Sequence, residues 1–149
     1  MDCDLHYHYA VYYLMQLVAL DDPVLRKVCR ADFVIGEKTL DRMFALMREK
    51  GGLGLAAPQV GIDARLFVTE WGEVFVNPRV VDIAGPIRVT EGCLSLPGVM
   101  AAVARWAKIR LADGRIYEGQ QAVVILHEID HLDGVLITDY PHERRHEGH

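Results

Sequence analysis

Two histidines, one glutamate and one cysteine could together form a hydrolytic metal centre. His127 and His131 are four positions apart, and Glu128 directly follows the first of them. On a helix of 3.6 residues per turn, side chains four positions apart project from one face, so both imidazoles would reach a single metal ion. Cys93 would supply a third ligand, which leaves a tetrahedral ion one position open for water. These residue types and this spacing predict a hydrolase.

The His-Glu-x-x-His pattern occurs twice, in two different contexts. Residues 122–132 around the first copy form an apolar stretch of helical length, which Gly134 can terminate. The alternative for this copy is a pair of core histidines that hydrogen-bond to Glu128. The second copy, residues 142–146, follows Pro141 among polar residues. We interpret the second copy as a solvated tail.

A segment rich in glycine and alanine, residues 51–61, has the sequence Gly-Gly-Leu-Gly-Leu-Ala-Ala-Pro-Gln-Val-Gly. Its small residues allow a backbone or a ligand to approach closely, and Gln59 is an amide in an otherwise apolar surround. The glycine spacing matches neither the P-loop nor the dinucleotide-binding pattern. A tight turn between a helix and a strand is the structural alternative for this segment.

The segment Glu-Gly-Cys-Leu-Ser-Leu-Pro-Gly, residues 91–98, contains a lone cysteine with glycine before it and proline after it. A free cysteine is usually a small buried apolar side chain, and this interpretation stays open for Cys93 taken alone. The other two segments provide the context in which Cys93 becomes a candidate ligand.

All three segments, in this order, resemble the signatures of the peptide deformylase family. The matching residues are Gly52 to Gln59, Glu91 to Ser95 and His127 to His131, and weaker similarity extends over about residues 15–140. The resemblance implies an α+β fold in which small β-sheets pack around a central helix that carries the HExxH motif. It also implies hydrolysis of the N-formyl group from the first methionine of newly made polypeptides, with release of formate.

Chemistry assigns roles to three further groups. Glu128 would accept a proton from water and deliver it to the leaving nitrogen. The side-chain amide of Gln59 and the backbone N–H of Leu94 would donate hydrogen bonds to the oxyanion that forms at the attacked carbonyl.

The resemblance assigns the substrate contacts and one supporting ion pair. It implies that the peptide and its methionine side chain lie against Leu53, Gly54, Gly92, Val123 and Val124. It also implies that Glu91 pairs with Arg105, which would orient the turn that carries Cys93.

We expect one divalent metal ion per chain, bound by Cys93, His127 and His131. A thiolate with two imidazoles suits Zn(II) by softness and geometry. The resemblance implies Fe(II) as the native ion, with Zn(II) or Ni(II) as alternatives.

Composition is that of an ordinary globular enzyme with 149 residues, 51% of them hydrophobic and 25% charged. A net charge of -5 argues against nucleic acid or anionic membranes as partners, so formylmethionyl nascent peptides are the expected partner. Three widely spaced cysteines indicate reduced thiols and therefore the cytoplasm. An organellar matrix or the cytoplasm of a virus-infected bacterium would fit equally well.

The elements that must position these residues follow from periodicity and turn signals. We expect an extension at residues 1–14, a catalytic domain at 15–140 and a polar tail at 141–149. Within the domain, helices are predicted at 38–50 and 119–133, and Asp113-Gly114 predicts a hairpin into 115–117. Strands are predicted at 65–69, 73–76, 79–83, 87–90 and 108–111.

The chain departs from the family pattern at three places. Leu126 stands where the family usually has glutamine, and the segment between Cys93 and His127 is shorter than expected, around residues 112–120. The polar tail in place of a C-terminal helix argues against ribosome docking by that route.

Two other classes of function remain as alternatives. One is an HExxH endopeptidase, which the upstream Cys93 and the missing downstream ligand disfavour. The other is a catalytically silent metal-binding domain, which the presence of Glu128 and Gln59 disfavours.

Overall fold

The computed structural model describes residues 15–141 of the chain. The predicted extension at 1–14 and the second HExxH copy at 142–146 lie outside the described residues. Within the described part, two three-stranded antiparallel sheets accompany two α-helices and three short 3-10 helices. The first sheet contains β1 (Gly54–Ala56), β2 (Leu66–Thr69) and β3 (Val74–Val76), and the second contains β4 (Val80–Cys93), β5 (Leu96–Leu111) and β6 (Ile116–Glu118). The α+β class is confirmed.

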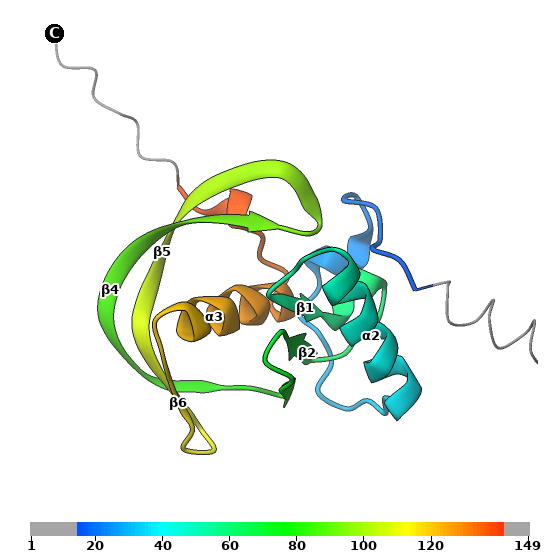
Figure 1. The fold of residues 1–149 in the computed structure, drawn as a ribbon, viewed down its shortest axis with the longest axis horizontal. Coiled ribbons are helices and arrows are strands. Elements are labelled where there is room, and N and C mark those ends of the chain that lie inside the picture. Colours follow the sequence, from blue (N-terminus) through cyan, green and yellow to red (C-terminus); the bar gives the residue numbers. More distant parts are fainter. Residues whose placement is uncertain (1–14, 142–149) are drawn as a thin grey trace, which may run out of the picture.

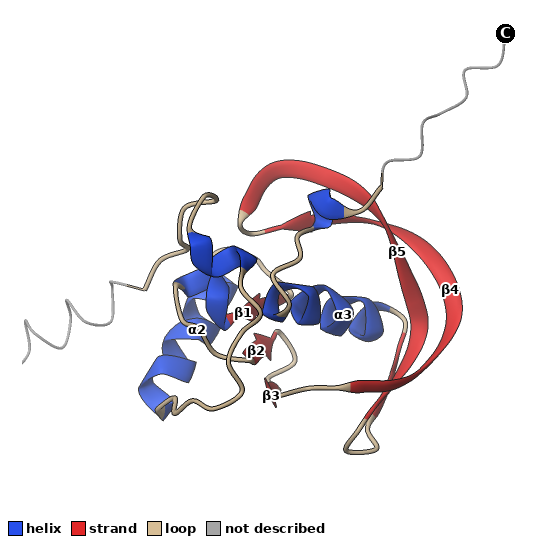
Figure 2. Cartoon of the chain, turned by 180° about the vertical axis from the view of Figure 1, so that it is seen from behind, coloured by secondary structure: helices blue, strands red, loops and turns tan. Residues whose placement is uncertain are grey.

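Helix α3 (Gln120–Leu132) lies at the centre of the molecule. The long curved hairpin β4–β5 wraps around one side of it, and the first sheet with helix α2 (Glu37–Glu49) lies on the other side (Figures 1 and 2). The helix begins after Gly119 and ends before Gly134, and both glycines have positive φ. Its apolar stretch therefore runs between two backbone positions that favour glycine, as the sequence predicted.

The β4–β5 hairpin is longer than the sequence predicted. β4 begins at Val80, one residue after the start of the predicted strand 79–83, and also contains the predicted strand 87–90. β5 extends from Leu96, although only 108–111 was predicted. Gly85 and Pro86 lie inside β4, where proline is tolerated because β4 is an edge strand. The register shifts between Glu91 and Cys93, and Cys93 pairs with Leu96 at the tip of the hairpin.

Three apolar clusters fix these elements against one another. One joins α3 to both sheets, and in it the rings of Phe67 and Phe75 stack with their centroids 4.6 Å apart. A second packs α2 against the first sheet. A third joins the hairpin tip to the last described segment, where the 3-10 helix η3 (Ile137–Asp139) lies; its buried residues are Leu96, Ala101, Val103, Leu136 and Ile137.

The glycine-rich segment is more than the tight turn that the sequence left open. Residues 54–56 form β1, which pairs with β2, and the 3-10 helix η2 (Ala57–Val60) follows. This order places the Gln59 side chain next to Cys93 and Ser95. In the part of the chain that the structure covers, no helix is long and apolar enough to cross a membrane.

Candidate functional site

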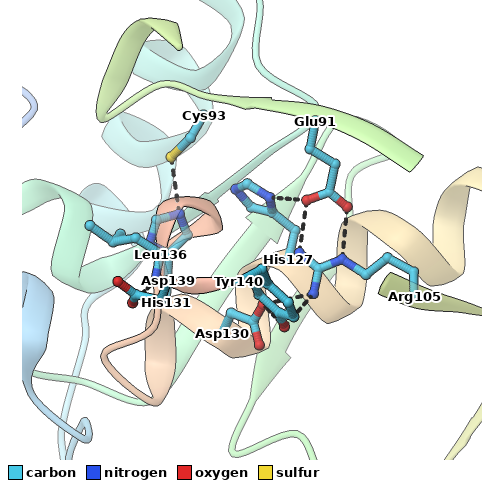
Figure 3. A network of polar contacts seen from close by, with 9 residues as sticks. All are labelled: Glu91, Cys93, Arg105, His127, Asp130, His131, Leu136, Asp139 and Tyr140. Atoms are coloured by element: carbon cyan, nitrogen blue, oxygen red, sulfur yellow. Dashed lines mark hydrogen bonds and ion pairs between the residues drawn. The ribbon is translucent and has the colours of Figure 1, made fainter. Parts of the chain in front are cut away.

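Three side chains from two elements form a cluster that could hold a metal ion. The ligand atoms of Cys93, His127 and His131 all lie within 4.8 Å of one another, and Cys93 Sγ is 3.3 Å from His131 Nε2 (Figure 3). Ligand atoms around a tetrahedral ion lie about 3.5 Å apart, given metal–ligand distances of about 2.0 to 2.3 Å. One thiolate and two imidazoles at these separations fit a divalent ion such as iron or zinc.

The carboxylate of Glu128 lies beside this cluster in a buried position. Its side chain lines the cavity described below, and its Oε2 has no hydrogen-bond partner among the described residues. Burial raises the pKa of Glu128 to about 7. A buried acceptor of this kind would be satisfied by a water molecule in the cavity.

The two histidines differ in protonation. Burial, followed by the charge of His127, lowers the pKa of His131 to about 3, so its imidazole is neutral. Burial alone would lower the pKa of His127, but hydrogen bonds with Cys93 and Glu91 outweigh this effect and raise the pKa to about 10. Because a metal ligand must be deprotonated, metal binding would release a proton from His127.

Glu91 connects His127 to Arg105. Its carboxylate accepts two hydrogen bonds from Arg105, at 2.7 and 2.8 Å, and one from His127 Nδ1 at 2.9 Å. Burial would raise the pKa of Glu91, but these partners lower it to about 2. An ionised Glu91 keeps the proton of His127 on Nδ1, which leaves Nε2 free to bind a metal.

Gln59 is fixed at both ends of its amide. Its Oε1 accepts from the backbone N–H of Ala56 at 2.9 Å, and its Nε2 donates to Ser95 Oγ at 3.1 Å and lies 3.8 Å from Cys93 Sγ. Sequence reasoning gave Ser95 no role, although it belongs to the Glu-Gly-Cys-Leu-Ser segment. The amide is thereby held next to the sulfur of Cys93.

A cavity of about 630 Å³ opens beside this cluster. Its walls come from the glycine-rich loop, the outer edge of β4 and the first turns of α3. It is lined by every residue that the sequence assigned to substrate or catalysis: Leu53, Gly54, Gln59, Gly92, Leu94, Val123, Val124 and Glu128. Other lining residues, among them Ile87, Val89, Thr90 and Gln120, were missed because their positions depend on the curvature of β4 and the start of α3.

Two glycines allow the loop to approach the site closely. A Cβ atom at Gly54 would lie 2.6 Å from Glu128 Oε1, and one at Gly52 would lie 2.6 Å from Leu94 Cδ1. Neither position has positive φ, so the requirement for glycine comes from close approach rather than backbone conformation.

Comparisons with known proteins identify the family of this chain. The family model for polypeptide deformylase matches residues 14–147. Peptide deformylase of Acetivibrio thermocellus is 42% identical over 132 residues, covering 79% of this chain and 78% of that protein. Peptide deformylase 1 of Clostridium perfringens is 40% identical over 136 residues, covering 80% of this chain and 92% of that protein.

Solved structures show the same fold. The crystal structure of peptide deformylase from Thermotoga maritima has a TM-score of 0.77 and 36% identity, covering 87% of this chain and 99% of that chain. The peptide deformylase from Synechococcus elongatus, solved in complex with actinonin, has a TM-score of 0.78 and 35% identity, covering 88% of this chain and 80% of that chain.

Proposed function

Because this chain belongs to the polypeptide deformylase family and removes the N-formyl group from newly made polypeptides, we propose that the cavity beside Cys93 is where it does so. The observation that carries this proposal is the convergence of Cys93, His127 and His131 within 4.8 Å at the wall of that cavity. Water is the second reactant, and the products are formate and a free amino terminus.

The proposed metal site uses these three residues as ligands to one divalent ion. Fe(II) is the proposed native ion, and Zn(II) and Ni(II) suit the same donor set. When bound, the ion supplies Lewis acidity, which polarises the formyl oxygen and lowers the pKa of water. Glu91 orients His127 for this role through its hydrogen bond to Nδ1.

Glu128 is the proposed proton carrier. It accepts a proton from the attacking water and passes it to the amide nitrogen as the carbon–nitrogen bond breaks. This role is supported by its unpartnered Oε2 at the cavity and by a pKa raised to about 7 through burial.

Gln59 and Leu94 are the proposed donors to the oxyanion. The Nε2 group of Gln59 carries two N–H bonds; it donates to Ser95 Oγ at 3.1 Å and makes a longer contact of 3.8 Å with Cys93 Sγ. With substrate bound, the N–H that faces the sulfur and the backbone N–H of Leu94 would stabilise the negative charge on the formyl oxygen. Loss of one such donor typically lowers the rate by about 10² to 10³.

The substrate peptide is proposed to lie along the outer edge of β4. This strand is the edge of its sheet, so its backbone groups on that side are available to pair with an extended peptide. The methionine side chain then packs against Val123, Val124 and Val89, with Leu53, Gly54 and Gly92 along the backbone. The proposed partners are formylated amino termini and exclude nucleic acid, in keeping with a net charge of -5.

The test is formate release from formyl-Met-Ala-Ser by the wild type, Glu128→Ala and the control Glu49→Ala. Each protein is purified anaerobically and loaded with Fe(II) or Zn(II), and metal content is measured beside activity. We expect turnover by the wild type and the control, and a loss of at least about 10²-fold in Glu128→Ala with one metal still bound per chain. Glu49 is an exposed helical glutamate that lies outside the proposed site.

Two results would contradict the proposal. Metal-loaded wild type that releases no formate would reject this site for the reaction. Cleavage of internal bonds in an unformylated peptide would favour the endopeptidase alternative.

A further inference from the structure

The hydrogen-bond network around His127 continues past Glu91 and Arg105 to two residues with no role so far, Asp130 and Tyr140 (Figure 3). Arg105 Nη1 donates to Asp130 Oδ2 at 2.7 Å and to the Tyr140 hydroxyl at 3.1 Å. The Tyr140 hydroxyl donates in turn to the same Asp130 oxygen at 2.7 Å. The guanidinium carbon also lies 5.2 Å from the centre of the Tyr140 ring. Arg105 is therefore held by Glu91, Asp130 and Tyr140 together.

Because Arg105 is buried, these contacts are needed to satisfy its guanidinium group. Its side chain is 2% exposed, and a buried guanidinium needs every N–H group paired. Nε and Nη2 donate to Glu91, whereas Nη1 donates to Asp130 and Tyr140. If the second pair of contacts is weakened, Arg105 can shift, and Glu91 must shift with it. Because Glu91 also receives the His127 Nδ1 proton, the shift reaches a proposed metal ligand.

Tyr140 is itself anchored to the fold. Asp139 accepts from the backbone N–H of Leu136 at 2.8 Å and pairs with Arg26 at 2.5 Å. Leu136 and Ile137 are buried in the apolar cluster against which both Cys93 and Tyr140 pack. The segment from Leu136 to Tyr140 thus supports the hairpin tip and the Arg105 network at once.

We propose that Asp130 and Tyr140 are positioning residues for the metal ligand His127, acting through Arg105 and Glu91. Neither residue lines the cavity, so their effect falls on metal retention rather than on contact with the substrate. This inference rests on the metal site proposed above.

The test compares two tyrosines that differ in what their hydroxyls support. Tyr140→Phe removes one hydroxyl and keeps the ring beside Arg105. Tyr117→Phe is the matched control, because the Tyr117 hydroxyl also donates to a carboxylate, Glu73 Oε2 at 2.6 Å, but outside this network. Wild type and variants are loaded with Zn(II), and the rate of zinc loss to an excess of coloured chelator is measured. The melting temperature of each metal-free protein is measured in parallel.

We expect Tyr140→Phe to lose zinc about 3 to 10 times faster than wild type, because direct partners of metal ligands typically contribute about 10- to 100-fold and Tyr140 acts through two intervening residues, Arg105 and Glu91. Asp130→Asn should lose zinc about 10 times faster. Since both act through Arg105, the double variant should resemble Asp130→Asn alone. Tyr117→Phe should stay within about twofold of wild type, even if its metal-free protein melts lower.

Equal rates of zinc loss for Tyr140→Phe and Tyr117→Phe would overturn the inference. If the equal rates are both faster than wild type, retention follows general stability rather than contact with Arg105. Wild type that binds no zinc would overturn the metal site as well. Wild type that binds zinc and a Tyr140→Phe variant that keeps it equally well would overturn only the positioning role.

Discussion

At the scale of single residues, the surroundings of Glu128 control its charge. The side chain is 4% exposed, Gly54 lies against Oε1, and burial raises the pKa to about 7. A carboxyl group with a pKa near neutrality can both accept and release a proton at physiological pH. Amide hydrolysis needs both steps, the first when water attacks and the second when nitrogen leaves.

The pH profile should therefore show an acidic limb due to Glu128. Only the ionised carboxylate can accept a proton, so kcat/KM should rise as pH increases through the pKa of Glu128 and then level off. A bound cation lowers that pKa, so the midpoint should lie at or below about 7. The measurement is kcat/KM against pH for wild type and for the residual activity of Glu128→Gln, which should lack this limb. A wild-type rate that falls as pH rises toward neutrality would contradict the assignment.

A methyl group at position 54 should displace the Glu128 carboxylate. The Cβ of Gly54→Ala would lie 2.6 Å from Oε1, and β1 is held in place by its pairing with β2. We expect kcat/KM to fall by about 10²-fold, as displacements of about 1 Å can cause, while metal content stays at the wild-type level. Gly36→Ala is the control, since a Cβ there meets nothing within 4 Å among the described residues. Wild-type activity in Gly54→Ala would show that the carboxylate has room to move.

At the scale of elements, the site is formed where α3 meets the tip of the β4–β5 hairpin. The sequence predicted α3 because its apolar run and the glycines at both ends are local signals. It did not predict the full hairpin, because Gly85-Pro86, Pro97-Gly98 and the alanines of β5 are poor strand formers taken alone. Pairing between the two strands overrides these preferences. Strand pairing, and with it the positions of Ile87 and Val89, depends on a partner distant in sequence.

The C-terminal end of α3 should be more sensitive to a methyl group than the hairpin. Gly134 and Gly98 both have positive φ, +71° and +76°. A Cβ at Gly134 would also lie 2.6 Å from the backbone of Arg26, whereas one at Gly98 meets nothing within 4 Å among the described residues. We expect Gly98→Ala to lower the free energy of unfolding by about 1 kcal/mol and Gly134→Ala by about 3 kcal/mol or more. Urea unfolding of the metal-free proteins measures both. Equal losses would mean that the backbone at Arg26, the end of the 3-10 helix η1 (Pro23–Arg26), moves away at little cost.

At the scale of the whole molecule, one metal ion would tie together parts of the chain that pack through separate clusters. Cys93 comes from the hairpin tip and both histidines from α3. The sequence predicted this convergence from residue types and motif order. It could not predict how Tyr140 and Asp130 complete the Arg105 network. Asp130 belongs to the His127 to His131 signature, but the signature does not say which residue it contacts, and Tyr140 belongs to no pattern. Only the folded arrangement of β4, β5, α3 and the last described segment brings them together.

Metal should accordingly stabilise the folded chain. A ligand that binds only the native state at about 100 times its dissociation constant adds about 2.7 kcal/mol, which for this size is about 5 to 10 °C in melting temperature. We expect Zn(II) to raise the melting temperature of wild type and of Cys29→Ala, but not that of Cys93→Ala. Cys29 is buried outside the ligand group, and burial raises its pKa to about 11. An equal rise in the melting temperature of Cys93→Ala would show that Cys93 is not a metal ligand.

If the substrate pairs with the open edge of β4 as proposed, the enzyme would select its substrate by shape as well as by chemistry. An edge strand accepts a neighbour only when that neighbour is extended. A formylated terminus that has already coiled into a helix, or has been enclosed in its own domain, offers no such strand. On this proposal, deformylation would have to precede folding of the first residues of the substrate. Chains that bury their first residues early in folding would keep their formyl group.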